Sequence, residues 1–345
     1  MIEQIRIGRT SDLPVEVPLI DVRTPAEFAH GHIPGAFNIP LFSDEERVKV
    51  GTTYKQQGKD AAVLLGFDIT GSKWSGFIKQ ALEIAPGKRL AVHCWRGGMR
   101  SGAMAWALNF YGFKVSVISG GYKAYRNAVH QSFSQSFKLY VLGGTTGSGK
   151  TEVLKELKAK GEQVIDLEEL AAHQGSAYGS LNRMKQPTQE QFENNLGEVI
   201  SKLDISKPVW VEDESINIGN CQVPKPFWSQ FAGSQLINLE VDREKRILHL
   251  SEVYGKLDKD FLIDRTMRIK KRLGPEQTKF AIAAINENRM DDFIRQVLIY
   301  YDKTYNASIA KRNPLDIINF TTNTSDISDK ASGVLQIIKD KIQQL

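Results

Sequence analysis

The sequence has few cysteines and no long apolar run, and both absences narrow the class of protein. Cys94 and Cys221 are the only cysteines in 345 residues, which excludes a disulfide framework and argues against a structural zinc site. No stretch approaches the ~18 consecutive apolar residues of a membrane span, and the N-terminal residues lack the apolar core of a signal peptide. We therefore expect a cytoplasmic protein whose Cys94 is kept reduced.

A strong excess of charge is also missing. The net charge is +5, and residues 131–345 contain 29 basic and 29 acidic side chains. Within this half, however, residues 243–312 carry 16 basic and 10 acidic side chains. Such a basic subregion is compatible with a polyanionic partner.

The distribution of apolar residues predicts two α/β domains. Short apolar runs typical of buried strands alternate with helical patterns, and the chain length suits two domains of ordinary size. We expect the first domain at 1–130 and the second at 137–345, with a mostly helical basic subregion at 243–312. The expected strands are 18–22, 89–93, 114–118, 138–142, 163–166, 208–212, 235–239 and 316–320, and the expected helices include 101–110 and 150–160.

A cysteine follows the predicted strand 89–93 and begins a loop that leads into a helix. Successive backbone N–H groups of such a loop can surround an oxyanion, and the N-terminus of the following helix adds positive potential. The same field, with two nearby arginines, should lower the pKa of the Cys94 thiol below the ~8.5 of a free cysteine. The predicted anion loop comprises Cys94, Trp95, Arg96, Gly97, Gly98 and Arg100.

A second anion loop follows the predicted strand 138–142. It matches the P-loop pattern G-x-x-x-x-G-K-S/T at every fixed position. Backbone N–H groups would hold a di- or triphosphate, Lys150 would neutralise its terminal charge, and Thr151 would bind Mg²⁺. The predicted site comprises Gly144, Gly147, Ser148, Gly149, Lys150 and Thr151.

Acidic residues follow two of the neighbouring strands. Glu212 ends the strand 208–212 and Asp213 follows it, where a metal-binding carboxylate of a P-loop protein is expected, and Asp166 ends the strand before it. A metal role for Asp213 or Glu212 and a solvated acidic turn are equal alternatives at this stage. The motif does not identify the ligand, because a nucleotide and any other diphosphate ester present the same oxygens.

Residues 1–130 resemble a rhodanese domain. The resemblance is carried by Asp21-Val22-Arg23, by Gly31-His32-Ile33-Pro34-Gly35-Ala36, by the Cys94 loop and by Gly120-Gly121-Tyr122. It implies that Cys94 carries sulfur or selenium. The spacing His-Cys-x5-Arg also matches cysteine phosphatases, and a loop of this size suits a phosphate-sized tetrahedral anion.

The order of motifs over nearly the whole chain resembles tRNA 2-selenouridine synthases. Beyond the two loops, this resemblance includes Asp166-Leu167-Glu168, His173-x-Gly175-Ser176 and Val211-Glu212-Asp213-Glu214. It implies that wobble 2-thiouridine in tRNA is S-geranylated from geranyl diphosphate and then converted to 2-selenouridine with selenophosphate. Cys94 would take the selenium, while Arg96, Arg100 and the loop amides hold the phosphate.

The resemblance also suggests supporting residues and partners. His173 is a candidate proton shuttle or phosphate ligand, with a surface histidine as an equal alternative, and Trp95 could stack on a base, line a prenyl pocket or simply pack. Asp166 and Ser176 belong to the matching motifs. The partners implied are tRNA, through its anticodon region, and an enzyme that supplies selenophosphate; neither DNA nor a membrane is expected, and Mg²⁺ is a candidate cofactor.

A basic stripe is predicted on one helix within 243–312. It comprises Arg265, Arg268, Lys270, Lys271 and Arg272, which suit a phosphate backbone, although a solvated helix face explains the same pattern. Tyr300, Tyr301 and Tyr305 are interpreted as core residues in preference to base-stacking residues.

Three other functions fit parts of the sequence. A P-loop kinase or NTPase with a regulatory rhodanese module would hydrolyse nucleotides and dispense with Cys94. A cysteine phosphatase would turn over phosphomonoesters, but the sequence offers no clear general-acid aspartate. A tRNA-binding protein without activity would leave two complete anion loops unexplained.

Overall fold

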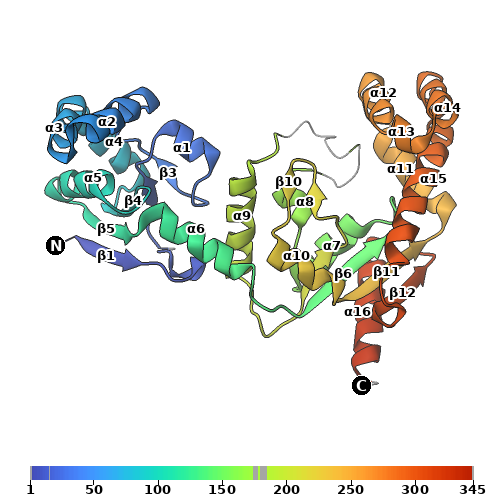
Figure 1. Cartoon of the computed structure of the whole chain (residues 1–345). Coiled ribbons are helices and arrows are strands. Elements are labelled where there is room, and N and C mark those ends of the chain that lie inside the picture. Colours follow the sequence, from blue (N-terminus) through green and yellow to red (C-terminus); the bar gives the residue numbers. More distant parts are fainter. Residues whose placement is uncertain (1, 15, 174–177, 179–184, 344–345) are drawn as a thin grey trace. The chain divides into compact units, whose positions relative to one another are not determined.

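The computed structural model describes residues 2–14, 16–173, 178 and 185–343, and these form two compact units (Figure 1). The first unit contains residues 1–134 and 188–202, and the second contains 135–187 and 203–345. Each unit is built on its own five-stranded parallel sheet, as the predicted α/β class requires. In the part of the chain that is described, no helix is long and apolar enough to cross a membrane.

The sheet of the first unit has the strand order β1-β5-β4-β2-β3, and every pair is parallel. Its central strands are almost wholly apolar because helices cover both faces, so Ile20, Val92 and Ile118 are fully buried. The predicted strands 18–22, 89–93 and 114–118 are confirmed. The strands are β1 Glu3–Arg6, β2 Leu19–Asp21, β3 Phe37–Asn38, β4 Arg89–His93 and β5 Lys114–Ser119.

The helices of this unit begin and end at recognisable signals. Thr24 and Ser43 each form a capping box at the start of a helix, and the helix predicted at 101–110 ends just before Gly112, which has a positive φ of 105°. The elements are η1 Thr10–Asp12, α1 Pro25–His30, α2 Asp44–Gln57, α3 Lys59–Thr70, α4 Trp74–Ile84, α5 Met99–Phe110 and α6 Gly121–Ser132.

One helix of the first unit comes from far along the sequence. Helix α9 (Gln189–Ser201) packs on α6, where Asn194 donates to the Tyr122 hydroxyl over 2.7 Å and Arg126 donates to the Asn194 side chain over 2.7 Å. The sequence predicted two contiguous domains, whereas here residues 188–202 belong to the first unit. The difference arises because α9 presents an amphipathic face whose partner, α6, cannot be identified from local pattern.

The sheet of the second unit has the order β12-β11-β6-β8-β7, again parallel throughout. All five of its predicted strands are confirmed, with ends that differ by one or two residues. The elements are β6 Leu139–Gly144, α7 Lys150–Ala159, β7 Gln163–Ile165, α8 Leu167–Leu170, β8 Val209–Glu212, β9 Asn217–Ile218, β10 Cys221–Gln222, α10 Lys225–Ala232, β11 Gln235–Val241, η2 Pro314–Asp316, β12 Ile317–Thr322 and α16 Ile327–Gln343.

Residues 243–309 form the predicted helical subregion, which has its own apolar cluster around Phe293 and Leu298. The basic stripe predicted on one helix is instead divided between two, because α12 ends at Arg268 and α13 starts at Lys270. Tyr300 and Tyr301 pack against the cluster, as predicted. The helices are α11 Arg243–Tyr254, α12 Lys259–Arg268, α13 Lys270–Leu273, α14 Pro275–Asn286 and α15 Met290–Ile309.

Candidate active site: a cysteine loop and a P-loop

The cysteine loop of the first unit connects β4 to α5. Its backbone is fixed by two hydrogen bonds, in which the N–H of Tyr122 donates to the Cys94 carbonyl and the N–H of Lys123 donates to the Trp95 carbonyl, each over 2.9 Å. Two glycines make this close packing possible. Gly97 and Gly121 have φ values of 64° and 57°, and a Cβ atom at Gly121 would lie 2.3 Å from the Cys94 carbonyl oxygen.

The Cys94 side chain lies inside the loop and is buried. Burial alone would raise its pKa, but hydrogen bonds from the Ser101 hydroxyl and from the N–H groups of Ser101, Gly98 and Arg96 outweigh burial and lower the pKa. Ser101 Oγ and the Gly98 nitrogen each lie 3.3 Å from Sγ. The sequence predicted a lowered pKa from the loop N–H groups, the start of the following helix and two nearby arginines. In the structure, the contributions that lower the pKa are hydrogen bonds within the loop and at the start of α5.

The two arginines of the loop have different surroundings. Arg100 forms an ion pair with Glu27 at 2.6 Å, and although burial opposes ionisation of Glu27, this arginine lowers the pKa of its carboxyl. Arg96 is exposed. The positive charge that remains available to an anion is therefore greater at Arg96, whereas Arg100 is held in a fixed position. Trp95 is partly exposed and its ring lies 5.7 Å from that of Tyr122.

A buried polar cluster lies at the ends of β2 and β4, next to the start of the cysteine loop. Arg23 is fully buried, binds both carboxylate oxygens of Asp21 and lies 3.7 Å from the centroid of the Tyr122 ring. His93 Nε2 is 3.7 Å from Asp21, and burial lowers the pKa of His93. The cluster joins the rhodanese-like motifs at residues 21–23 and 120–122, and Tyr122 connects it to the loop through its N–H bond to the Cys94 carbonyl.

The P-loop of the second unit connects β6 to α7, as predicted. Three of its carbonyls are bound by cationic side chains: Lys150 donates to Gly144 over 3.0 Å, Arg246 to Thr146 over 3.1 Å, and Lys330 to Ser148 over 3.4 Å. Gly147 and Gly149 have φ values of 85° and 87°, which L side chains rarely adopt. The Ser148 hydroxyl is buried without a hydrogen-bond partner among the described residues. Within the loop, the Ser148 N–H donates to the Thr145 carbonyl over 3.1 Å. The cationic side chains bind carbonyl oxygens of the loop and therefore take up none of its N–H groups, which are the donors that phosphate oxygens need.

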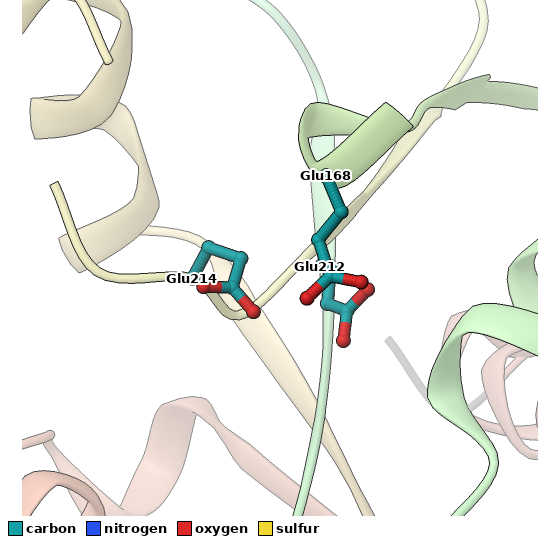
Figure 2. A group of neighbouring side chains, drawn as sticks. All are labelled: Glu168, Glu212 and Glu214. Atoms are coloured by element: carbon teal, nitrogen blue, oxygen red, sulfur yellow. The ribbon is translucent and has the colours of Figure 1, made fainter. Parts of the chain in front are cut away.

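Three glutamates gather beside the P-loop (Figure 2). One ligand oxygen from each of Glu168, Glu212 and Glu214 lies within 4.8 Å of the others. The Thr151 hydroxyl is 3.4 Å from both Glu168 and Glu212. Burial and the neighbouring carboxylates raise the pKa of Glu168 to about 9 and that of Glu214 to about 8, and burial raises that of Glu212. Three ionised carboxylates would carry more negative charge than Lys150 alone compensates, and their oxygen donors are those that Mg²⁺ prefers.

The other acidic residues predicted for this site have different roles. Asp213 forms an ion pair with Arg312 at 2.7 Å, so Glu212, rather than Asp213, is the carboxylate beside Thr151. Asp166 caps α8 by accepting a hydrogen bond from the Glu169 N–H. His173 is half-buried, and burial and the nearby Arg265 lower its pKa. Ser176 lies outside the described residues.

The predicted basic residues differ in how much charge they expose. Arg265 is mostly buried and lies over the Phe261 ring, whereas Arg268 is exposed and pairs with Asp264 at 3.1 Å. Arg272 donates to the Tyr300 hydroxyl over 3.3 Å. Lys270 and Lys271 are both exposed. Arg268, Lys270 and Lys271 are therefore the best-placed members of the group for a phosphate backbone.

Sequence reasoning did not select several residues that complete the two loops. Ser101 directly follows Arg100 in the first turn of α5, and this position was the available signal for a hydroxyl near the thiol. Glu27 belongs to the rhodanese-like sequence motifs, but its ion pair with Arg100 is visible only in the fold. Arg246 and Lys330 are far from the P-loop in sequence, so no local pattern indicated them. Glu168 was part of a matching motif, but only the fold shows that its carboxylate meets those of Glu212 and Glu214.

Comparisons with known proteins match both the region that contains the cysteine loop and the region that contains the P-loop. Residues 137–335 match the family model of the tRNA 2-selenouridine synthase AAA domain, and residues 9–128 match that of the rhodanese-like domain. Similar proteins named tRNA 2-selenouridine synthase occur in Nitrosomonas eutropha (34% identical, covering 94% of this chain and 82% of that protein) and Hydrogenovibrio crunogenus (36%, 91% and 94%). A third, from Nitrosomonas europaea, is 40% identical over 69% of this chain and 64% of its own length.

Proposed function

Because this chain belongs to the tRNA 2-selenouridine synthase family, we propose that it converts 2-thiouridine in the anticodon region of tRNA to 2-selenouridine through an S-geranyl intermediate. Geranyl diphosphate and selenophosphate are the co-substrates. The observation that carries the proposal is the presence of two differently built anion sites in one chain. One contains an activated thiol and the other a lysine with a carboxylate cluster.

In the first reaction, the sulfur of 2-thiouridine attacks C1 of geranyl diphosphate, a C–S bond forms, the C–O bond breaks and diphosphate leaves. The P-loop N–H groups and Lys150 bind the diphosphate and stabilise the charge that develops on it. Carboxylates keep Lys150 protonated, because their attraction outweighs burial and raises its pKa. Mg²⁺ bound by Thr151, Glu168, Glu212 and Glu214 would neutralise further negative charge on the diphosphate.

In the second reaction, selenium replaces the S-geranyl group at C2 of the base, so that a C–Se bond forms, the C–S bond breaks and geranylthiol leaves. A selenium atom carried on Cys94 as a selenosulfide would be oxidised and would require a reductant. A route without redox change is attack of the Cys94 thiolate on phosphorus. An S–P bond then forms, the P–Se bond breaks, and selenide is released next to the base. Water later hydrolyses the S-phosphocysteine to phosphate and thiol.

The geometry of the cysteine loop supports attack at phosphorus. The thiol pKa is lowered by hydrogen bonds, and Arg96 and Arg100 belong to a loop of the size that suits a tetrahedral anion. Arg100 is oriented by Glu27, so it can contact the phosphoryl oxygens without first being ordered. The proposal requires an enzyme that supplies selenophosphate as a partner. Exposed basic residues of α12 and α13 would bind the tRNA backbone.

The direct test is nucleoside mass spectrometry of tRNA containing 2-thiouridine after incubation with the protein, geranyl diphosphate and selenophosphate. The proposal predicts 2-selenouridine when both co-substrates are present and S-geranyl-2-thiouridine when selenophosphate is omitted. Unchanged tRNA under both conditions, together with nucleotide hydrolysis, would favour the kinase or NTPase alternative.

A further inference from the structure

A large cavity in the first unit lies beside the cysteine loop and is not explained by either anion site. It has a volume of about 1030 Å³ and is bounded by α2, α3 and α5. Pockets for small ligands commonly measure roughly 300–1,000 Å³. The cavity is therefore large enough for an organic group of considerable size.

The walls of this cavity carry large apolar side chains that folding leaves exposed. Val48 is 67% exposed and Trp106 is 59% exposed, and Tyr54, Phe67 and Met99 are also on the wall and exposed. Exposed apolar area that is concentrated in one place costs free energy and marks surfaces that bind an apolar ligand. The occupant of this cavity should therefore be largely hydrocarbon.

Charge and position define the occupant further. Four described residues of the wall are cationic, namely Arg47, Lys55, Arg96 and Arg100, and none of the described wall residues is acidic. Arg96 and Arg100 also belong to the cysteine loop, so the apolar cavity and the anion site share part of their walls. This arrangement fits a hydrocarbon chain attached to a centre that reacts with an anion at Cys94.

We propose that this cavity binds the geranyl chain of S-geranyl-2-thiouridine in tRNA while selenium is delivered from the Cys94 loop. The inference rests on the proposed function and adds to it a site for the intermediate. Geranyl diphosphate has its diphosphate site at the P-loop, whereas the chain attached to the nucleoside must lie near Cys94 during the second reaction. Burial of the chain would also place the C–S bond that breaks next to the anion loop and exclude water from it.

The test compares two anticodon stem-loop RNAs, one bearing S-geranyl-2-thiouridine and one bearing S-methyl-2-thiouridine, for binding to the full chain. Wild type should prefer the geranyl RNA by at least about tenfold, because the chain buries many more methylene equivalents than a methyl group does. Ala103→Phe on α5, which fills the cavity, and Val63→Asp on α3, which places a charge in its wall, should each abolish most of this preference.

Matched controls exist on the same helices. Phe110 on α5 and Leu64 on α3 are exposed and do not line the cavity, so Phe110→Ala and Leu64→Asp should keep the wild-type preference. Thermal unfolding of all four variants checks that each is folded. Equal binding of the two RNAs by wild type, or equal loss in control and cavity variants, would overturn the assignment.

A second measurement tests whether the cavity binds the geranyl chain of the tRNA intermediate or that of geranyl diphosphate. Ala103→Phe should still form S-geranyl-2-thiouridine from geranyl diphosphate at close to the wild-type rate, and its conversion to 2-selenouridine should fall by about tenfold or more. Loss of the first reaction in this variant would show that the cavity binds the donor and would overturn the proposal. If wild type makes 2-selenouridine yet shows no geranyl preference, only the cavity assignment fails; if it makes none, the proposed function fails.

Discussion

The cysteine loop and the P-loop share one backbone plan but balance charge in opposite ways. Each follows a strand of a parallel sheet, curls through glycines with positive φ and opens a helix. In the cysteine loop, hydrogen bonds lower the pKa of a thiol, and the partly buried Arg100 is already paired with the Glu27 carboxylate. At the P-loop, three glutamates gather near one lysine, and burial together with the neighbouring carboxylates raises the pKa of Glu168 and Glu214.

This difference shows that two anion loops with similar backbones can suit different chemical steps. The cysteine loop is complete without a metal ion, because its nucleophile is activated by its own backbone and Ser101. The P-loop site reaches charge balance only when a proton or a cation joins the carboxylates. The following predictions test this contrast, from the largest expected effect to the smallest.

Arg100→Ala should slow conversion of S-geranyl-2-thiouridine to 2-selenouridine by about 10²–10³-fold, since it removes a positioned cation from the phosphoryl group. The geranylation reaction should be unaffected. Rates of the two reactions, measured separately on 2-thiouridine RNA and S-geranyl RNA, check this. Lys123→Ala, an exposed cation whose backbone alone contacts the loop, is the control. Equal slowing of both reactions would argue against separate roles for the loops.

Ser101→Ala should raise the pKa of Cys94 and lower its reactivity with iodoacetamide near neutral pH by about tenfold, the effect of one pKa unit. A lowered pKa means that wild-type Cys94 reacts at a lower pH than a free cysteine. Cys221, whose pKa burial raises, serves as the internal control. Peptide-resolved labelling across a pH series gives both profiles, and an unchanged Cys94 profile in the variant would remove Ser101 from the account.

The carboxylate cluster should make stability fall with pH unless a cation is present. Glu168 and Glu214 hold protons up to about 9 and about 8 in the folded state but only to about 4.3 when unfolded, so the folded state binds more protons between these values. Their stabilising contribution is lost as pH rises through 8 to 9. We expect Mg²⁺ to raise Tm more at pH ~9 than at pH ~7, by about 2–4 °C for each kcal/mol gained.

The control for this experiment is Glu169→Gln, a change at an exposed neighbour outside the cluster, which should behave as wild type. Glu168→Gln should flatten the pH dependence of Tm and weaken the response to Mg²⁺. The cation-binding account fails if Mg²⁺ leaves Tm unchanged at both pH values.

The smallest effects are expected in tRNA binding. Arg268→Ala and Lys271→Ala should each weaken affinity about two- to threefold at physiological salt and reduce the slope of log K against log salt by about one. Lys279→Ala, which removes an exposed cation of α14, is the comparison. A titration of tRNA binding at several salt concentrations distinguishes these cases. An identical response of all three variants would show that the loss of affinity reflects net charge and not a specific binding surface.

Much of this architecture was predictable because strands and loops are encoded locally. The buried strands 89–93 and 138–142 and the loops after them follow from apolar runs, glycines and the residues at helix starts. The pairing of α9 with the first unit depends on contacts between residues more than sixty positions apart, such as Asn194 with Tyr122. The ion pairs Arg100–Glu27 and Asp213–Arg312 are equally non-local. The second of them shows why sequence position alone could not decide between Glu212 and Asp213 as the carboxylate beside Thr151.

The most direct test of the division between the two loops is nucleoside mass spectrometry of 2-thiouridine tRNA after incubation with both co-substrates and wild type, Cys94→Ala or Lys150→Ala. The account predicts 2-selenouridine with wild type, accumulated S-geranyl-2-thiouridine with Cys94→Ala, and neither product with Lys150→Ala. Formation of 2-selenouridine by Cys94→Ala, or of the S-geranyl product by Lys150→Ala at the wild-type rate, would contradict it.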